Sequence, residues 1–307
     1  MGDRRAFAPP FAANPRINLG PRFWVGRERS AGAALLIALA ALWSFWPTLG
    51  QLVRAWFHDS QYSHGILVPL FSFGLLWSRR DRFPAAARPA PVSGFALLAF
   101  AAAVRVFGGA IYFAWLDQIA LLPFLAGLVL VFGGWPVLRW AAAPLLFLAY
   151  MVPLPYRFEV LLGFPLQRLA TDASTYVLQT LGQPAIAEGT AILIRDFKLS
   201  IVKACSGLSM LVTFFTFSTA VCLVVKKPVS DKLLILLSAI PIALVTNILR
   251  IVLTGLMHLH VSSESANAFF HDAAGWFMMP LALVFLWAEL WVLRRLFVDA
   301  RARPALC

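Results

Sequence analysis

Three residues with the side chains of a thiol-based catalyst stand near the ends of apolar segments: Cys205, Arg250 and His271. Cys205 is followed by Ser206 and Gly207, where a charged, alternating segment gives way to a long apolar run. The thiolate is the nucleophilic form of cysteine, and a helix N-terminus or nearby cations lower the thiol pKa. A histidine can act as base and acid near neutral pH, and an arginine can stabilise an oxyanion. Together, the three side chains would support nucleophilic attack on a carbonyl group.

Each of these residues also has an ordinary structural explanation. A single cysteine is often a packing residue, and an arginine at a membrane boundary can extend its charged end toward water. His271, next to Asp272, can simply cap a helix. Composition and spacing alone leave the catalytic and the structural explanations both open. The choice depends on whether the fold brings the three residues to one place.

The composition is that of an integral membrane protein. Of the 307 residues 61% are hydrophobic and 13% are charged, and the mean hydropathy is +0.79. A soluble domain has about 45–50% apolar and roughly 25% charged residues. The net charge of +12 is better explained by basic cytoplasmic loops than by a nucleic-acid partner. The three cysteines are widely spaced and form neither a disulfide framework nor a metal-binding knuckle.

Runs of about 20 apolar residues predict membrane-spanning helices. We expect an all-α, polytopic bundle of about eight spans, near residues 31–54, 64–78, 92–111, 116–133, 138–154, 206–225, 232–257 and 272–294. If the N-terminus is cytoplasmic, 18 of the 26 Lys and Arg residues fall in the inner segments. This asymmetry predicts cytoplasmic tails at residues 1–29 and 296–307, on either side of a membrane domain at residues 30–295.

Residues 157–204 are too polar to span a membrane and are predicted to cap the outer face. The first part is amphipathic and interrupted by Gly163 and Pro165, which indicates short helices lying at the interface. The second part alternates between apolar and polar residues around Arg195 and Asp196, which indicates a β-hairpin.

The predicted order of spans carries the three candidate residues to one membrane face. Cys205 precedes the sixth span at its outer end, and His271 precedes the eighth, also at its outer end. Arg250 follows the start of the seventh span near Lys232 by about 27 Å at 1.5 Å per residue, which is close to the outer boundary. Ser206 and Gly207 would offer backbone N–H groups at a helix start, and Gly207 would let a substrate approach closely.

Other polar residues are predicted to lie at or near the same face. His58, Asp59, Tyr62 and His64 could bind substrate, line the site, hold a metal or form a hydrated loop. Asn247, one helical turn before Arg250, could orient the guanidinium or form an interhelical hydrogen bond. Arg105 lies deep in the third span, where a charge is costly and often functional, or it could snorkel outward toward water. The remaining candidates are predicted to be structural: His258 and His260 in a loop, Cys222 in mid-span and Cys307 in the tail.

Three segments resemble the motifs of the exosortase/archaeosortase family in order and spacing: "KACSGLSML" from Lys203, "NILRIVLTGL" from Asn247 and "HDAAGW" from His271. "HDSQYSHGILVPLFSFGLLWSRR", from His58, resembles the first outer loop and second span of that family. The resemblance extends over about residues 30 to 295. Lys203 departs from the pattern, since the residue two before the cysteine is often acidic in the family.

The resemblance implies a membrane cysteine protease or transpeptidase that needs no cofactor. It implies that Cys205 is the nucleophile, Arg250 the transition-state stabiliser and His271 the acid and base. The implied substrates are exported surface proteins that end in a Pro-Glu-Pro signal, a transmembrane helix and a basic tail. The enzyme would lie in the bacterial cytoplasmic (inner) membrane, surrounded by lipid, with its site toward the periplasm.

Two other classes of function compete with this interpretation. A transporter or flippase for an exopolysaccharide or lipid-linked unit would be expected to show broken helices and internal repeats, and the sequence shows broken segments without a visible repeat. A metal-dependent membrane protease could use His58, His64 and His271 as ligands. Inhibition by alkylating agents but not by chelators would favour the cysteine enzyme.

Overall fold

The computed structural model describes residues 40, 43–59, 61–84, 88–195, 197–201 and 207–260, and a few positions between 284 and 291. The chain divides into two units, Met1–Pro47 and Thr48–Cys307, and nearly all described residues belong to the second. The tails predicted at residues 1–29 and 296–307 lie outside the described residues. So do most of the span predicted near residues 272–294 and the first part of the span predicted near residues 31–54.

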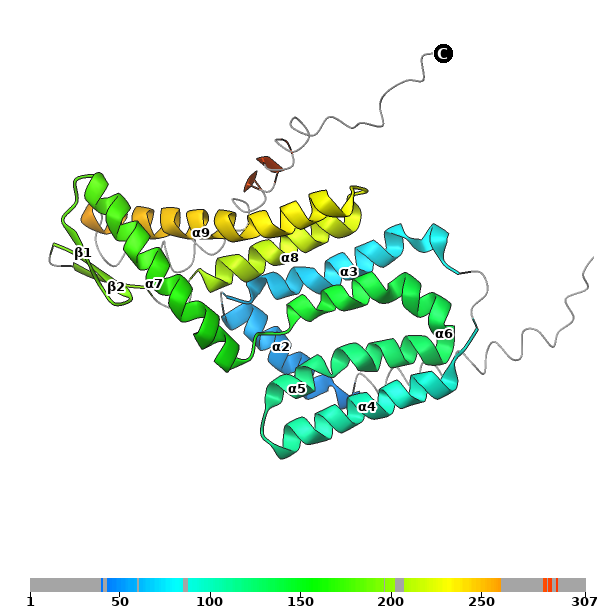
Figure 1. The fold of residues 1–307 in the computed structure, drawn as a ribbon. Coiled ribbons are helices and arrows are strands. Elements are labelled where there is room, and N and C mark those ends of the chain that lie inside the picture. The colour runs from blue at the N-terminus through cyan, green and yellow to red at the C-terminus, as the bar shows by residue number, and fades with distance from the viewer. Residues whose placement is uncertain are drawn as a thin grey trace, which may run out of the picture. The chain divides into compact units, whose positions relative to one another are not determined.

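Helices make up most of the described chain, as the sequence predicts (Figure 1). Their bounds are α2 Trp46–His58, α3 Leu67–Ser78, α4 Pro91–Ala110, α5 Ala114–Ile119, α6 Leu121–Phe147, α7 Tyr156–Thr180, α8 Leu208–Val224 and α9 Val229–His260. Short 3₁₀ helices occupy Ser63–Ile66, Arg80–Arg82 and Leu148–Met151. The protein is therefore an α-helical bundle, with one small sheet among the described residues.

Three of the described helical stretches are long and apolar enough to cross a membrane: Pro91–Ala110, Ala114–Met151 and Val229–Leu259. The apolar helices Ser63–Ser78 and Leu208–Val224 are shorter. Large apolar side chains cover the outside of α4, among them Phe95, Phe100 and Val106, as expected for a helix that faces lipid. The predicted number of eight spans is not confirmed and stays a prediction.

The longest of these stretches contains a sharp bend in α6. At Gly134 the backbone has φ 72° and ψ −171°, and the helix turns back on itself there (Figure 1). The first arm packs on α4, where Ala90 N donates to Leu130 O at 3.0 Å. The second arm packs on α3, where Ser72 Oγ donates to Pro144 O at 3.2 Å. The two arms correspond to the spans predicted near residues 116–133 and 138–154.

The predicted interruption of the cap helix at Gly163 and Pro165 is wrong, because α7 runs without a break from Tyr156 to Thr180. A proline inside a helix removes one backbone hydrogen bond and disfavours helix locally. Packing offsets this loss. Ala170 and Leu178 of α7 are fully buried, and Gly163 lies close to Leu208 of α8.

A three-stranded antiparallel sheet follows α7, with strands β1 Ala185–Glu188, β2 Ala191–Ile194 and β3 Phe197–Ser200 in the order β1-β2-β3. The predicted hairpin is confirmed as β2 and β3, with Arg195 at the turn in the left-handed region (φ 52°). β1 was not predicted. The sheet packs through Ile192 and Ile194 against Leu178 of α7 and Ile251 of α9.

Candidate active site

The start of α8 is a meeting point of three helices. Gly207 is buried and has φ 83°, a left-handed conformation that favours glycine. A Cβ atom at this position would lie 3.4 Å from Asn247 Nδ2 on α9 and 3.7 Å from Leu166 Cβ on α7. The first turn of α8 begins here, with Leu211 N donating to Gly207 O at 2.9 Å. The structure therefore brings together two predicted site residues, Gly207 and Asn247, which are 40 positions apart in the sequence.

Arg250 lies inside the protein. It follows Asn247 by about one turn of α9, and the two side chains are 6% and 0% exposed. A charged side chain within a membrane-spanning segment is unfavourable and usually marks a functional site. Arg250 does not extend to the lipid-facing surface in this structure, so its burial disfavours the explanation that it is only an interfacial anchor.

The chain that leads from the sheet to the predicted nucleophile is anchored at Ile201. This residue is 3% exposed, its N–H donates to Thr190 O at 3.0 Å, and its carbonyl accepts a hydrogen bond from Gln167 Nε2. Gln167 and Leu166 are neighbours on α7, so the chain contacts the same part of α7 at Ile201 and at Gly207.

Some of the predicted catalytic residues that follow Ile201 in the chain are not described by the structure. Cys205, Ser206 and His271 lie outside the described residues, so their predicted roles stay predictions. Cys222, by contrast, is buried in α8 and packs against Ile235, as expected of a structural cysteine.

Tyr62 belongs to a buried polar cluster next to the start of α7. Its hydroxyl donates to Glu159 and accepts hydrogen bonds from Gln61 Nε2 at 2.8 Å and from Leu154 N at 3.1 Å. Burial, reinforced by the hydrogen bond to the Glu159 carboxylate, raises the pKa of Tyr62, so the phenol keeps its proton. Sequence reasoning missed Gln61 and Glu159. An acidic residue in the first turn of α7 was the available signal.

His64 is 1% exposed and faces α8. Its Nδ1 lies 3.4 Å from Thr213 Oγ1, and its Nε2 is buried without a hydrogen-bond partner among the described residues. His58, in contrast, is exposed and contacts Arg54 O. In the described part of the chain, no group of three His, Cys, Asp or Glu side chains is arranged to hold a metal ion.

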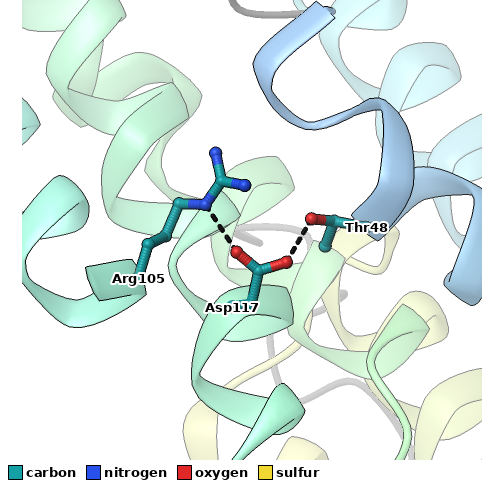
Figure 2. A network of polar contacts seen from close by, with 3 residues as sticks. All are labelled: Thr48, Arg105 and Asp117. Atoms are coloured by element: carbon teal, nitrogen blue, oxygen red, sulfur yellow. Dashed lines mark hydrogen bonds and ion pairs between the residues drawn. The ribbon is translucent and has the colours of Figure 1, made fainter. Parts of the chain in front are cut away.

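Arg105 and the histidines of α9 have roles that the sequence did not predict. Arg105 of α4 pairs with Asp117 of α5 at 2.5 Å, and Thr48 of α2 donates to the other Asp117 oxygen (Figure 2). The pair ties three helices together, so Arg105 is not a simple snorkelling residue. His258 and His260 belong to α9, not to a loop, because this helix extends one turn further than predicted. His258 stacks on Phe197 of β3 with ring centroids 4.4 Å apart.

The apolar helices and the buried polar residues at their ends define an integral membrane protein with an internal polar site. Residues 56–288 match the family described as transmembrane exosortase. The match covers well over half of the chain, so the protein belongs to the exosortase family, a family of sorting-related transpeptidases. Comparison with curated proteins and with solved structures gave no match.

Proposed function

We propose that the protein is a membrane-embedded cysteine protease or transpeptidase that removes the C-terminal sorting signal of exported proteins. The proposed substrates carry a Pro-Glu-Pro signal, a transmembrane helix and a basic tail. We further propose that the enzyme acts at the outer face of the bacterial inner membrane. The observation that carries the proposal is the contact between Gly207, two residues after Cys205, and Asn247, one turn before the buried Arg250.

Covalent geometry links this contact to the predicted nucleophile. Two peptide units separate Cys205 from Gly207, so their Cα atoms can be no more than about 7.6 Å apart. Arg250 follows Asn247 by about 4.5 Å along the helix axis. Because both distances are short, they support the proposal that the Cys205 thiol and the buried Arg250 guanidinium act in one site.

The reaction that these groups would carry out is acyl transfer. The Cys205 thiolate attacks the scissile carbonyl, and Arg250 stabilises the oxyanion that forms. The C–N bond then breaks, the leaving amine takes a proton from His271, and a thioester remains. Water or an acceptor amine releases the product, with His271 accepting its proton. Backbone N–H groups of Ser206 and Gly207 would assist, because the first N–H groups of a helix have no partner within the helix.

The remaining predicted residues would support this site. Asn247 is fully buried beside Gly207 and would hold α9 against the start of α8. Tyr62, through Glu159, would fix the outer loop to α7. His64 would pack that loop against α8 through Thr213.

The test replaces the predicted nucleophile and a buried cysteine in parallel. Cys205→Ala should abolish processing, so that full-length substrate accumulates in the membrane. Cys222→Ala is the matched control, since that thiol packs in α8 away from its start, and it should still process substrate. The measurements are substrate processing and the amount of inserted enzyme. Processing by Cys205→Ala at the parent rate would overturn the proposal and favour the transporter or metal-enzyme alternatives.

A further inference from the structure

We propose that the edge of β3 that faces away from β2 binds the extended sorting segment of the substrate as an added β-strand. This inference rests on the proposed function and assigns a docking element to it. In the described part of the chain β3 pairs only with β2, so its second edge has no strand beside it. Peptides commonly bind to such edges through backbone hydrogen bonds.

The register shows which backbone groups β3 presents at this edge. Ile201 N donates to Thr190 O, and Leu199 and Phe197 pair with Ile192 and Ile194 of β2. Bonded residues alternate along an antiparallel strand. The N–H and C=O groups of the intervening residues, Lys198 and Ser200, therefore point away from β2, and both of these residues are exposed.

A Pro-Glu-Pro segment has the pattern that this edge can accept. An added strand needs backbone donors only on the side that faces β3, and prolines are tolerated in a strand where the N–H position faces solvent. With the glutamate paired to β3, both prolines face away. The glutamate side chain then lies on the same face as Lys198, where opposite charges across strands attract. Lys198 can leave Glu188 and pair with the substrate glutamate, because its ion pair with Glu188 is exposed and therefore contributes little stability.

The position of β3 relative to the candidate active site favours the β3 edge of the sheet over the β1 edge as the docking element. β3 continues through Ile201 toward Cys205, and the sheet packs on α9 where Gly255 contacts Ile194, about one and a half turns beyond Arg250. The opposite edge is partly occupied, because Gln179 Nε2 donates to Ala185 O of β1 at 2.8 Å.

The first experiment introduces a proline at each edge of the sheet. Ser200→Pro removes an outward N–H of β3 and leaves the bonds between β2 and β3 in place. Ala187→Pro is the matched control, since Ala187 alternates with the bonded residues of β1 and faces outward at the opposite edge. Ser200→Pro should lower processing about tenfold or more, the scale of one lost hydrogen bond plus exclusion of the added strand. Ala187→Pro should process at the parent rate.

A small thiol-reactive probe separates docking from chemistry. It should label Cys205 equally in the parent and in Ser200→Pro, which shows that the variant is folded and that its site is intact. Equal processing by Ser200→Pro and the parent overturns the docking proposal and leaves the proposed function standing. Processing by Cys205→Ala overturns the proposed function itself.

The second experiment exchanges the charges and does not depend on proline. Lys198→Glu should lower processing of the Pro-Glu-Pro substrate severalfold, and a substrate with Pro-Lys-Pro should restore it in this variant only. The matched control is Lys227→Glu, at a basic residue in the loop between α8 and α9 that is far from the sheet in the sequence. Restoration supports the pairing of Lys198 with the signal glutamate, and its absence contradicts that pairing.

Discussion

Arg250 places a permanent charge in the interior of a helix bundle. A planar guanidinium can hold an oxyanion or a carboxylate through two N–H groups, which a lysine ammonium cannot do in the same geometry. The side chain is 6% exposed, so water cannot readily substitute for it. Its chemical identity, and not only its charge, should therefore matter.

We expect Arg250→Lys to lower substrate processing by roughly two orders of magnitude or more, the scale of losing one oxyanion donor. The measurement is the rate of processing at equal amounts of inserted enzyme. Arg168→Lys, at an exposed position of α7, serves as the control and should process normally. Near-parent activity of Arg250→Lys would reduce Arg250 to a structural cation.

At the scale of elements, the bend in α6 decides how two apolar segments pack. Gly134 has φ 72°, and a Cβ atom there would lie 1.7 Å from Arg88 O. No other residue type fits this conformation and this contact without moving the backbone. Pro136 stands near the start of the second arm, where a missing N–H is tolerated.

Gly134→Ala should therefore destabilise the protein. Strain at a positive φ contributes about 1–3 kcal/mol, and displacement of Arg88 adds to it, so Tm should fall by roughly 5 °C or more. Thermal unfolding of the detergent-solubilised protein measures this. Gly74→Ala in α3, where a Cβ would meet no atom within 4 Å, should leave Tm unchanged or slightly raised. Equal Tm values for the two variants would show that the bend tolerates a side chain.

At the scale of the whole second unit, the contacts separate into two ends of the bundle. At one end the Arg79 side chain donates through Nη2 to Leu223 O at 3.1 Å. The backbone carbonyl of Arg79 accepts a hydrogen bond from Trp140 Nε1, also at 3.1 Å. At the other, Trp56 Nε1 donates to Met151 O at 2.9 Å, and Tyr62 contacts Glu159. Basic residues gather in the segments at the first end, and the positive-inside rule therefore predicts that this end is cytoplasmic.

Fusion of alkaline phosphatase, which is active only outside the cytoplasm, tests this orientation. A fusion after Ser200 should be active, because β3 belongs to the predicted outer cap. A fusion after Lys227 should be inactive, because it follows α8 at the basic end. Immunoblots control for the amount of each fusion. The reverse pattern of activity would contradict the outer location of the site.

The sequence by itself determined the membrane class, most helices and the hairpin of β2 and β3. These features depend on local patterns: apolar runs specify helices that face lipid, and the alternation from Phe197 to Ile201 after the charged Arg195 and Asp196 specifies a hairpin. The order of spans also predicts that Cys205, Arg250 and His271 reach one membrane face, which stays a prediction because Cys205 and His271 lie outside the described residues. Among the described residues, Gly207 lies next to Asn247, one turn before Arg250.

Only the tertiary structure decided the features that depend on distant partners. α7 continues through Pro165 because its buried face packs on α8 and α9, and that packing outweighs the local loss of a hydrogen bond. β1 contains two alanines, which have low strand propensity, and forms because β2 offers an edge. Glu159 has a hydrogen-bond partner in Tyr62, 97 residues earlier, only because the folded chain brings the two together. Local sequence fixes which groups need a partner, whereas the packed chain decides which partner each one receives.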